Sequence, residues 1–590
     1  MKFRILSFIQ NLRYFINLTY RVDRRLFYFN VFAFIILAIL PLASLWMLQE
    51  MVDKVLEYRS ITHRSVLTFL FLLVAVQILQ SFVQHWTQYF QQKQQQQLSE
   101  HITLRVLTKA GRIPYSYYEN PAYYDSLHMA QQQSAYLPSL VIQQVQSILQ
   151  QVISVLALTV FLVTLHWSIP VFLILLSLPL AVSRLVYGQK QFQLEKQILP
   201  EQRKAYDFFQ YLTNNTYAKE IRVFGLGDYF TDRYHQLMQS IFRQRDRLHF
   251  IHMRKGMLAS VFEVVFIAVF YLLLISRAIS GVISIGGLIV YVQAFQRLQL
   301  AIQTIFKSGV AIFQHQLYLQ EIIRYLSLPA SKENEPAGSD TFSNSYDSIR
   351  IRNLTFRYPG TERDVLRDIS MEFGRGKVIA VVGENGSGKS TLMKLLCGLY
   401  RADEGRIFFG NMDSHELPPA FFQRDVSVVF QDYCRYHLSL GENIALGKKE
   451  IDRDRIHETL DASTGSELMS GTGLSLDSGL GRNYQLGEEI SGGQWQKIAI
   501  SRALYRAHEV LILDEPTSAI DAGAESFIFQ NLRRNAGNRI IILITHRLYN
   551  LKLADHIYVM KDYRLVESGS FDELTQRKGL FWEYYNAQKI

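Results

Sequence analysis

The stretch Gly383-Glu384-Asn385-Gly386-Ser387-Gly388-Lys389-Ser390 decides the fold of the second half of this chain. An apolar run, Val378–Val382, precedes it and predicts a strand, and a helical pattern begins at Lys389 and continues through Leu399. A strand, a glycine-rich turn and a helix in this order predict a phosphate-binding loop, because the glycines let backbone N–H groups point at phosphates. The N-terminus of the helix adds positive potential at the same place.

Two side chains of this loop carry the predicted chemistry. Lys389 should reach the β- and γ-phosphates of ATP, and Ser390 should ligate Mg²⁺. The remaining residues expected around the phosphates are Gly383, Asn385, Gly386, Ser387, Gly388 and Thr391. The sequence therefore predicts ATP and Mg²⁺ as ligands.

Further polar residues follow other apolar strands. Asp514 ends the run Val510–Leu513, where a carboxylate can orient Mg²⁺ through water. Its neighbour Glu515 is the better candidate for positioning or deprotonating the water that attacks the γ-phosphate. His546 closes the run Arg539–Thr545 and is predicted to contact the γ-phosphate at the same sheet edge.

The region from Ser348 to the end alternates short β-rich runs with helical stretches. That alternation predicts a largely parallel sheet flanked by helices, which is an α/β fold. The segment 329–347 is polar and rich in Ser, Pro and Gly, and it predicts a linker. The expected domain limits are therefore 1–328 for the first domain and 348–590 for the second.

The first domain is predicted to be an all-α membrane domain. Six apolar runs have about the 20 residues that a helix needs to cross hydrocarbon. They lie near 26–48, 65–86, 140–165, 168–187, 257–276 and 282–304. Long polar helical stretches, near 87–139 and 188–256, separate the second run from the third and the fourth from the fifth.

Charge assigns the two sides of the membrane. Lys and Arg concentrate in the N-terminal segment and the two long connections, whereas the other connections hold Lys54, Arg59, Arg64 and Arg277. The positive-inside rule then places both termini and the second domain in the cytoplasm. Buried helices of a soluble protein would not explain this asymmetry. The net charge is +10, but the Lys and Arg residues do not cluster into a compact basic stripe interleaved with aromatic residues. No nucleic-acid partner is therefore expected.

The segment Ile490-Ser491-Gly492-Gly493-Gln494 resembles the signature motif of ABC transporters. With the six apolar runs, the whole chain resembles an exporter-type half-transporter: a six-helix transmembrane domain followed by an ABC-type P-loop ATPase domain. The resemblance implies that Tyr358 stacks on adenine and that Gln431 senses Mg²⁺ and the γ-phosphate. It also implies a D-loop at Ser518–Asp521, with Asp521 at the ATP site, and a contact with the membrane domain in Gly481–Glu489.

In that family, two nucleotide domains close head-to-tail around two ATP molecules. Ser491, Gly492, Gly493 and Gln494 of one chain then complete the phosphate loop of the other. This chain has one copy of each part, so a homodimer with two active sites is expected, and a heterodimer with a related chain stays open. Ile490 and Ile520 stand where the family usually has Leu, and neither change removes a polar group.

Two connections resemble the short coupling helices that dock onto nucleotide domains in this family. They are 114–125 (PYSYYENPAYYD) and 214–226 (NNTYAKEIRVFGL). Their aromatic residues suit a docking surface. Ordinary packing within a helical bundle is the alternative.

The apolar runs carry many polar side chains. They are Gln77, Gln80, Ser81, Gln84 and Gln88; Gln143, Ser147, Gln150 and Ser154; and Gln293, Gln296, Arg297, Gln303, Thr304 and Lys307. Polar residues within a membrane face the bundle interior or a watery cavity, although some of these can lie on solvated extensions of the helices. Glu263 and Arg297 are charged side chains within predicted membrane spans, where a charge costs the most free energy to bury. They are expected to pair with each other or to contact cargo.

A path rich in uncharged amides favours a peptide as the cargo. The segments Leu476–Gly487, Ser491–Lys497 and Glu119–Pro121 look most like the lantibiotic and bacteriocin exporter subgroup. That resemblance implies a bacterial cytoplasmic (inner) membrane as the location. The sequence thus predicts ATP-driven export of a peptide by alternating access. A lipid flippase or multidrug exporter of the same fold is the alternative within transporters. A soluble ABC-type ATPase acting on DNA and a nucleotide-gated channel are the alternatives from other classes.

Overall fold

The computed structural model describes residues 17, 20–58, 64–119, 127, 136–163, 168–328, 346–403, 405–481, 487–506, 508–517 and 520–588. These residues form two compact units. The first contains the described residues up to Gly111 and those from 127 to Leu328. The second contains those from Tyr346 onward together with the segment that begins at Arg112. The predicted linker falls almost wholly outside the described residues.

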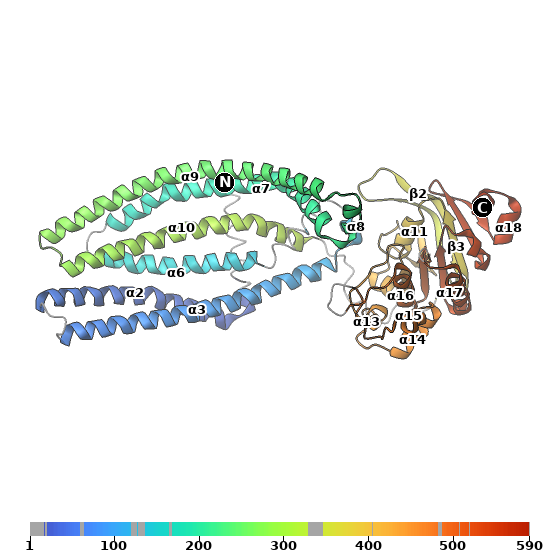
Figure 1. The fold of residues 1–590 in the computed structure, drawn as a ribbon, viewed down its shortest axis with the longest axis horizontal. Helices are drawn as coiled ribbons and strands as arrows, with labels where there is room; N and C mark the ends of the chain where they lie inside the picture. Colours follow the sequence, from blue (N-terminus) through green and yellow to red (C-terminus); the bar gives the residue numbers. More distant parts are fainter. Residues whose placement is uncertain are drawn as a thin grey trace. The chain divides into compact units, whose positions relative to one another are not determined.

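The first unit is built from long helices. They are α2 (Arg24–Tyr58), α3 (Arg64–Ala110), α6 (Leu137–Val163), α7 (Ser168–Thr213), α8 (Asn215–Val223), α9 (Gly227–Ile279) and α10 (Ile285–Ser327). Helix α2 packs beside α3, α6 beside α10, and α7 beside α9 (Figure 1). The short helix α8 lies between α7 and α9 in the sequence.

The predicted membrane spans fall on these helices. Five of them, α2, α3, α6, α9 and α10, contain a window long and apolar enough to cross a membrane. The fourth predicted run, 168–187, lies at the start of α7, where most side chains between 172 and 181 are outside the described part of the chain. The helical membrane domain is thus confirmed, while a count of six spanning helices stays a prediction.

The N-terminus of α10 is tied to the end of α2. Asp53 accepts a hydrogen bond from the Ser284 hydroxyl at 2.6 Å and one from the Gly286 N–H at 2.9 Å. A Cβ atom on Gly286 would lie 2.5 Å from Asp53 Oδ1 and 2.7 Å from the Gln49 carbonyl oxygen. Only glycine therefore permits this approach of the two helices.

Gly286→Ala is expected to destabilise the protein by about 1–3 kcal/mol, because the new methyl group must push α2 and α10 apart. Thermal unfolding of the detergent-solubilised protein measures the effect. Gly309→Ala, on the same helix, is the matched control, since a Cβ there meets nothing within 4 Å. The control should be neutral or stabilising by up to about 1 kcal/mol, because Ala favours helix over Gly. Equal effects of the two substitutions would contradict this account of the helix contact.

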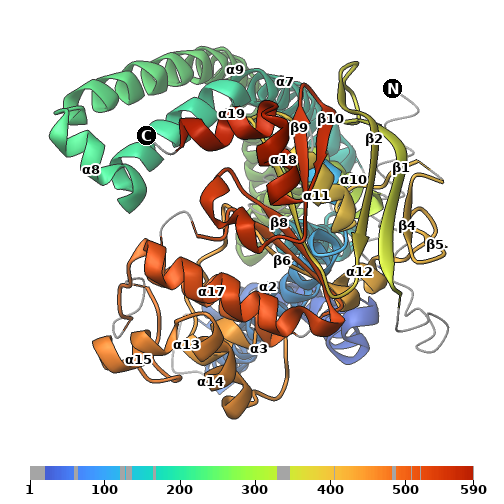
Figure 2. The same cartoon turned by 90° about the vertical axis from the view of Figure 1, so that its right-hand side faces the viewer.

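The second unit contains two sheets. The six-stranded sheet has the order β10-β9-β3-β8-β7-β6, and the four-stranded sheet has the order β2-β1-β4-β5 (Figure 2). Strands β9, β3, β8, β7 and β6 run parallel, whereas β10 is antiparallel to β9. The strands are β1 (Ser348–Arg357), β2 (Asp364–Gly374), β3 (Val378–Gly383), β4 (Ile407–Phe409), β5 (Met412–Asp413), β6 (Val426–Val429), β7 (Val510–Asp514), β8 (Ile540–Ile544), β9 (His556–Lys561) and β10 (Arg564–Gly569). The predicted α/β fold with a largely parallel sheet is confirmed.

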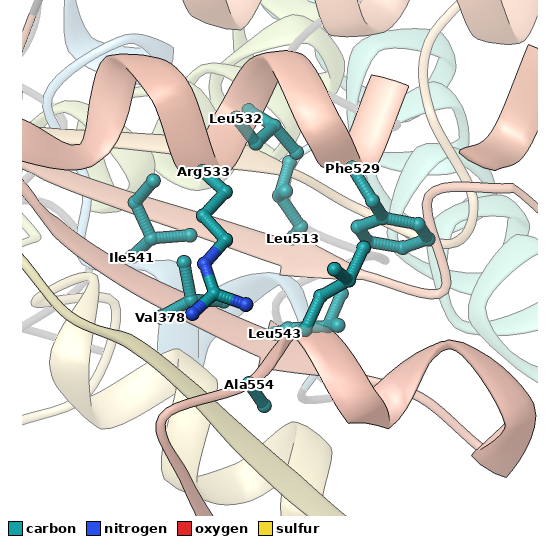
Figure 3. Close-up of a pocket in the computed structure, with 9 residues that line it drawn as sticks. Val378, Leu513, Phe529, Leu532, Arg533, Ile541, Leu543 and Ala554 are labelled. Carbon is teal, nitrogen blue, oxygen red and sulfur yellow. The ribbon is translucent and has the colours of Figure 1, made fainter. Parts of the chain in front are cut away.

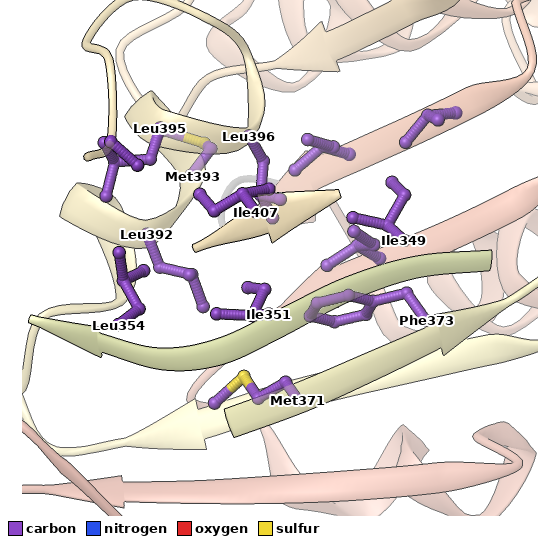
Figure 4. Packing of buried hydrophobic residues seen from close by; sticks show 14 of the residues in the cluster. Ile349, Ile351, Leu354, Met371, Phe373, Leu392, Met393, Leu395, Leu396 and Ile407 are labelled. Atoms are coloured by element: carbon purple, nitrogen blue, oxygen red, sulfur yellow. The ribbon is translucent and has the colours of Figure 1, made fainter. Parts of the chain in front are cut away.

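Both faces of the parallel sheet are covered, because successive side chains of a strand point to opposite faces. In β3, Ile379 and Val381 join one hydrophobic cluster, whereas Val378, Ala380 and Val382 join another. The first cluster also contains residues of the four-stranded sheet and of helix α11 (Figure 4). This two-sided burial holds the ends of β3, β6, β7 and β8 in fixed positions.

The helices of the second unit are mostly short. They are α4 (Tyr115–Tyr118), α11 (Lys389–Leu396), α12 (Pro419–Asp425), α13 (Leu440–Ile444), α14 (Arg453–Ala462), α15 (Ser466–Thr472), α16 (Gly492–Tyr505), α17 (Ala522–Arg534), α18 (Phe571–Arg577) and α19 (Leu580–Ala587). Two 3₁₀ helices, η2 (Asn535–Asn538) and η3 (Leu548–Leu553), complete the described elements.

Candidate ATP site

The phosphate loop joins β3 to α11, as predicted. The loop bends sharply at Gly386 and Gly388, whose φ angles are +81° and +103°. A Cβ on Gly388 would lie 2.7 Å from the Val365 carbonyl oxygen, so glycine is required there by both conformation and space. The loop therefore has the glycine conformations that let its backbone approach a phosphate chain closely.

Lys389 is buried against this loop. Its Nζ donates to the carbonyl oxygens of Gly383 and Glu384, both at 2.8 Å, and to the Ser387 hydroxyl at 3.4 Å. Burial lowers the pKa of Lys389, although the nearby Glu515 and Asp514 charges oppose this shift. The three oxygen atoms that accept these hydrogen bonds are neutral, so the buried ammonium is suited to an anion, and the phosphates of ATP supply one.

Glu515 lies at the centre of the predicted hydrolytic group. Its Oε2 accepts a hydrogen bond from Gln431 Nε2 at 2.8 Å, and its Oε1 lies 2.8 Å from His546 Nδ1. The three residues follow β6, β7 and β8, so the carboxyl ends of three parallel strands bring them together. The φ angle of Glu515 is +48°, an uncommon conformation for this residue type, and its N–H donates to the Ile544 carbonyl oxygen. The backbone thus holds the carboxylate at this edge.

Asp514 is buried beside Glu515. Burial, and after it the Glu515 carboxylate, raise the pKa of Asp514 to about 6. A carboxyl group that resists ionisation here is suited to a cation, because a bound cation favours the charged form. The donor set Ser390, Gln431 and Asp514 therefore fits Mg²⁺, which prefers oxygen ligands.

Asp514→Asn is expected to raise the melting temperature of the nucleotide-free protein in EDTA, more at pH 8 than at pH 4.5. The folded-state pKa lies above the unfolded value, so the folded state binds more protons between about pH 4 and pH 6. Stability from this group falls as the pH rises through that window. The full loss is at most about 3 kcal/mol at pH 8. Thermal unfolding at both pH values measures it, and an equal shift at both would contradict the assignment.

Tyr358 lies at the other end of the predicted nucleotide site. It follows β1, and its hydroxyl is 3.0 Å from the Thr391 hydroxyl on α11. The Tyr400 ring meets it edge-on, with the ring centroids 5.1 Å apart. The structure thus places Tyr358 against the helix that follows the phosphate loop, while its role in stacking on adenine stays a prediction.

The signature segment forms the start of α16. The Ser491 hydroxyl accepts the Gln494 N–H at 3.3 Å, and the Gln494 side chain accepts the Ser491 N–H at 2.7 Å, which together form a capping box. Ser491 is exposed, and Gly492 and Gly493 follow it in the first turn. This leaves a helix N-terminus with an exposed serine, a geometry that suits an anion.

Asp521 precedes α17 and accepts the Ala524 N–H at 2.9 Å. This backbone hydrogen bond holds the pKa of Asp521 below its usual value. Ser518 and Ala519 of the predicted D-loop, and residues 482–486 of the predicted contact segment, lie outside the described residues. Of the two predicted coupling segments, 114–125 is described only as far as Glu119, whereas 214–226 is described throughout and contains α8.

The predicted partnership of Glu263 and Arg297 does not form in this structure. Glu263 Oε1 instead accepts hydrogen bonds from the amides of Gln299 and Gln303, and Arg297 donates to the Pro41 carbonyl oxygen at 3.2 Å. The reason is helical phase: Arg297 and Gln299 are two positions apart on α10, so their side chains leave the helix on different faces.

Sequence reasoning missed several residues around the site. Gln496 Nε2 donates to the Glu515 carbonyl oxygen at 3.2 Å, and the Tyr584 hydroxyl donates to Glu384 of the phosphate loop at 2.7 Å. Lys394 contacts Tyr358 and two further aromatic rings. The signature helix could have indicated Gln496 by its position, whereas Tyr584 is 200 residues away from its partner and has no sequence signal.

A small cavity elsewhere in the unit belongs to the core. It measures about 10 Å³ and lies between α17 and the six-stranded sheet (Figure 3). Its lining is apolar apart from Arg533, which pairs with Asp555 at 3.7 Å. A space of this size with so few polar partners is a packing void.

Known proteins match both halves of the chain. Residues 26–302 match the ABC transporter transmembrane region, and residues 366–518 match the ABC transporter family. The solved structure of a bacterial Atm1-family ABC exporter with ATP bound has a TM-score of 0.80, covers 96% of this chain and 99% of that chain, and is 19% identical in sequence. This likeness confirms the fold.

Curated relatives match over most or part of the length. The subtilin transport ATP-binding protein SpaT of Bacillus subtilis is 30% identical over 576 residues, 96% of this chain and 92% of the relative. The nisin transport ATP-binding protein NisT of Lactococcus lactis subsp. lactis is 28% identical over 97% of this chain and 95% of its own. The ATP-dependent lipid A-core flippase of Escherichia coli (strain K12) is 34% identical over 44% of each chain. On this evidence the chain belongs to the ABC transporter family, as an exporter with fused transmembrane and ATPase domains.

Proposed function

We propose that this ABC exporter works as a homodimer that moves a peptide out of the bacterial cytoplasm with ATP and Mg²⁺ at two composite sites. The observation that carries the ATPase part is the Glu515 carboxylate held between Gln431 and His546, at the ends of three parallel strands. Such a carboxylate can accept a proton from water at the γ-phosphate, and the two neighbours fix its direction.

The remaining residues bind the nucleotide in this proposal. Lys389 and the loop N–H groups hold the phosphates, and Tyr358 stacks on adenine. When bound, Mg²⁺ would neutralise phosphate charge, held by Ser390 and Gln431 and, through water, by Asp514. Gln431 and His546 orient the water and the γ-phosphate.

The dimer is inferred from the two places in one chain that suit a phosphate. One is the phosphate loop, and the other is the exposed N-terminus of α16, with Ser491 at its cap. A second copy would place this terminus and Asp521 against the first copy's ATP, and the same contact would repeat around a two-fold axis. The segments 114–119 and 214–226 would then couple the ATPase domains to the helices. Both termini and the ATPase domain are cytoplasmic in this arrangement.

The cargo is argued from one face of α3. Gln77, Ser81, Gln84 and Gln88 recur at spacings of four, three and four residues, and all four are exposed in the single chain. Helical geometry puts them on one side of α3. Lipid would leave their amide and hydroxyl groups without hydrogen bonds, so this side should line a watery path between two chains. Amides in such a path can pair with the backbone of a peptide.

The relatives support the same cargo class. The proteins named for subtilin and nisin transport match nearly the whole chain. The lipid A-core flippase matches 44% of it, and that match favours a lipid as the second candidate cargo. The polar face of α3 favours a peptide over a lipid as the cargo.

Inside-out membrane vesicles test the proposal. Vesicles that contain the protein receive ATP and a mixture of modified peptides, lipids and lipophilic dyes, and mass spectrometry identifies what accumulates. Vesicles with Glu515→Gln protein are the control. Uptake of peptide that is absent from the control supports a peptide exporter, whereas uptake of lipid or dye alone overturns the peptide cargo.

A further inference from the structure

Lys394 lies at the centre of a cluster that borders the proposed adenine site at Tyr358. Its Nζ lies 5.5 Å from the Tyr115 ring centroid, 5.6 Å from that of Tyr358 and 5.9 Å from that of Tyr400. The same Nζ donates to Glu119 Oε1 at 2.7 Å. An ammonium among three tyrosine rings and one carboxylate gains cation–π attraction and an ion pair together.

The cluster joins two distant parts of the sequence within one compact unit. Tyr115 and Glu119 come from the segment that begins at Arg112, whereas Lys394 lies on α11, directly behind the phosphate loop. The Tyr400 hydroxyl donates to Glu119 as a second link, and the Tyr115 and Tyr400 rings meet edge-on at 6.0 Å. This segment is thus held by Lys394 and Tyr400.

Glu119 and Lys394 each stabilise the charged form of the other. Burial alone would raise the pKa of Glu119, but the hydrogen bonds from Lys394 and Tyr400 hold it below its usual value. Burial alone would lower the pKa of Lys394, but the hydrogen bond to Glu119 and the nearby tyrosines raise it. Both groups therefore stay charged near neutral pH, and the Lys394 ammonium is fixed about 5.6 Å from the Tyr358 ring.

We propose that Lys394 is a positioning residue that ties the Tyr358 platform to the segment 112–119, so that adenine bound on Tyr358 and the attachment of that segment stabilise each other. The inference rests on the proposed adenine-stacking role of Tyr358. The Tyr358 side chain contacts the Thr391 hydroxyl, the Phe356 and Tyr400 rings and the Lys394 ammonium. Two of these neighbours, Tyr400 and Lys394, also hold Glu119. A ligand that orders the ring must strengthen the attachment, and thermodynamic linkage makes the effect reciprocal.

The test compares a ligand that has a base with one that has none. ATP and inorganic tripolyphosphate both bind the phosphate loop, but only ATP reaches Tyr358. In the full-length Glu515→Gln protein, Lys394→Met should weaken ATP binding about 5-fold and leave tripolyphosphate binding unchanged. Isothermal titration calorimetry measures both affinities. A damaged fold would weaken both ligands, so the ratio separates positioning from structure.

A double-mutant cycle and a control complete the affinity test. Glu119→Gln should weaken ATP in the same direction, and the double variant with Lys394→Met should lose less than the sum, because both changes break one pair. Lys578→Met is the matched control, since Lys578 makes the same kind of contact with the Trp582 ring at 5.9 Å. The control should leave both affinities unchanged.

Hydrogen exchange measures the second expected effect, which is that bound ATP strengthens the attachment of segment 112–119. Amide exchange in 112–119 should slow when ATP is added to the Glu515→Gln protein, and tripolyphosphate should not slow it. With Lys394→Met this response to ATP should disappear. The proposal is overturned if Lys394→Met changes the two affinities equally, changes neither, or leaves the exchange response intact. If Tyr358→Leu does not weaken ATP relative to tripolyphosphate, the adenine assignment itself fails. Neither readout depends on the identity of the cargo.

Discussion

Glu515→Gln is expected to lower kcat for ATP hydrolysis by about 10²- to 10⁴-fold, the usual contribution of a positioned general base. The amide keeps the shape of the side chain and can still contact Gln431, but it cannot accept a proton from water. ATP binding should persist, because Lys389 and the phosphate loop are untouched. Phosphate release from purified protein measures hydrolysis, and calorimetry measures binding.

The control for this substitution is Glu509→Gln. Glu509 lies immediately before β7 and pairs with Arg375 at 2.5 Å, so it flanks the same strand as Glu515 but at the opposite end, in a half-buried pair. Its loss should change hydrolysis less than about 2-fold, since the pair lies away from the carboxyl end of β7 and contributes to stability alone. If Glu515→Gln hydrolyses ATP at the rate of the Glu509→Gln control, another group is the base.

Much of the ATP site could be predicted because its signals are local or topological. The phosphate loop depends on glycines at fixed positions between one strand and one helix, and these can be read in consecutive residues. Gln431, Glu515 and His546 are far apart in sequence, but each follows an apolar strand. Parallel strands put their carboxyl ends at one edge, which is why the three meet.

The contacts that could not be predicted depend on long-range packing. The family resemblance predicts that 114–125 docks onto a nucleotide domain, but nothing in the sequence indicates that Glu119 meets Lys394, 275 residues later. The partners of Arg297 depend on the rotation of α10 against α2 and α9, and sequence spacing gives the faces of a helix without saying which neighbour each face meets. Charge alone suggested a pair with Glu263, whereas amide and carbonyl groups supply the partners.

The composite site leads to a second large effect. Lys389→Met removes the ammonium that faces the phosphates and should reduce hydrolysis to background. Gly492→Asp should do the same for another reason, because it puts a negative charge at the N-terminus of α16, where the partner's γ-phosphate is proposed to bind. The fold should tolerate it: a Cβ there lies 4.0 Å from the nearest atom outside its neighbours, Arg435 Nη2, and an acidic residue in the first turn stabilises a helix.

Chains that carry the two different changes should restore each other. If Lys389→Met and Gly492→Asp chains pair at random in equal amounts, half of the dimers are mixed. Each mixed dimer has one intact site of two, formed by the phosphate loop of the Gly492→Asp chain and the signature segment of the Lys389→Met chain. The mixture should therefore recover about a quarter of the wild-type rate. Co-expression with two affinity tags isolates the mixed dimers, in which the rate should reach about half. A site completed within one chain would leave every mixture inactive, because each chain then lacks one part of its only site.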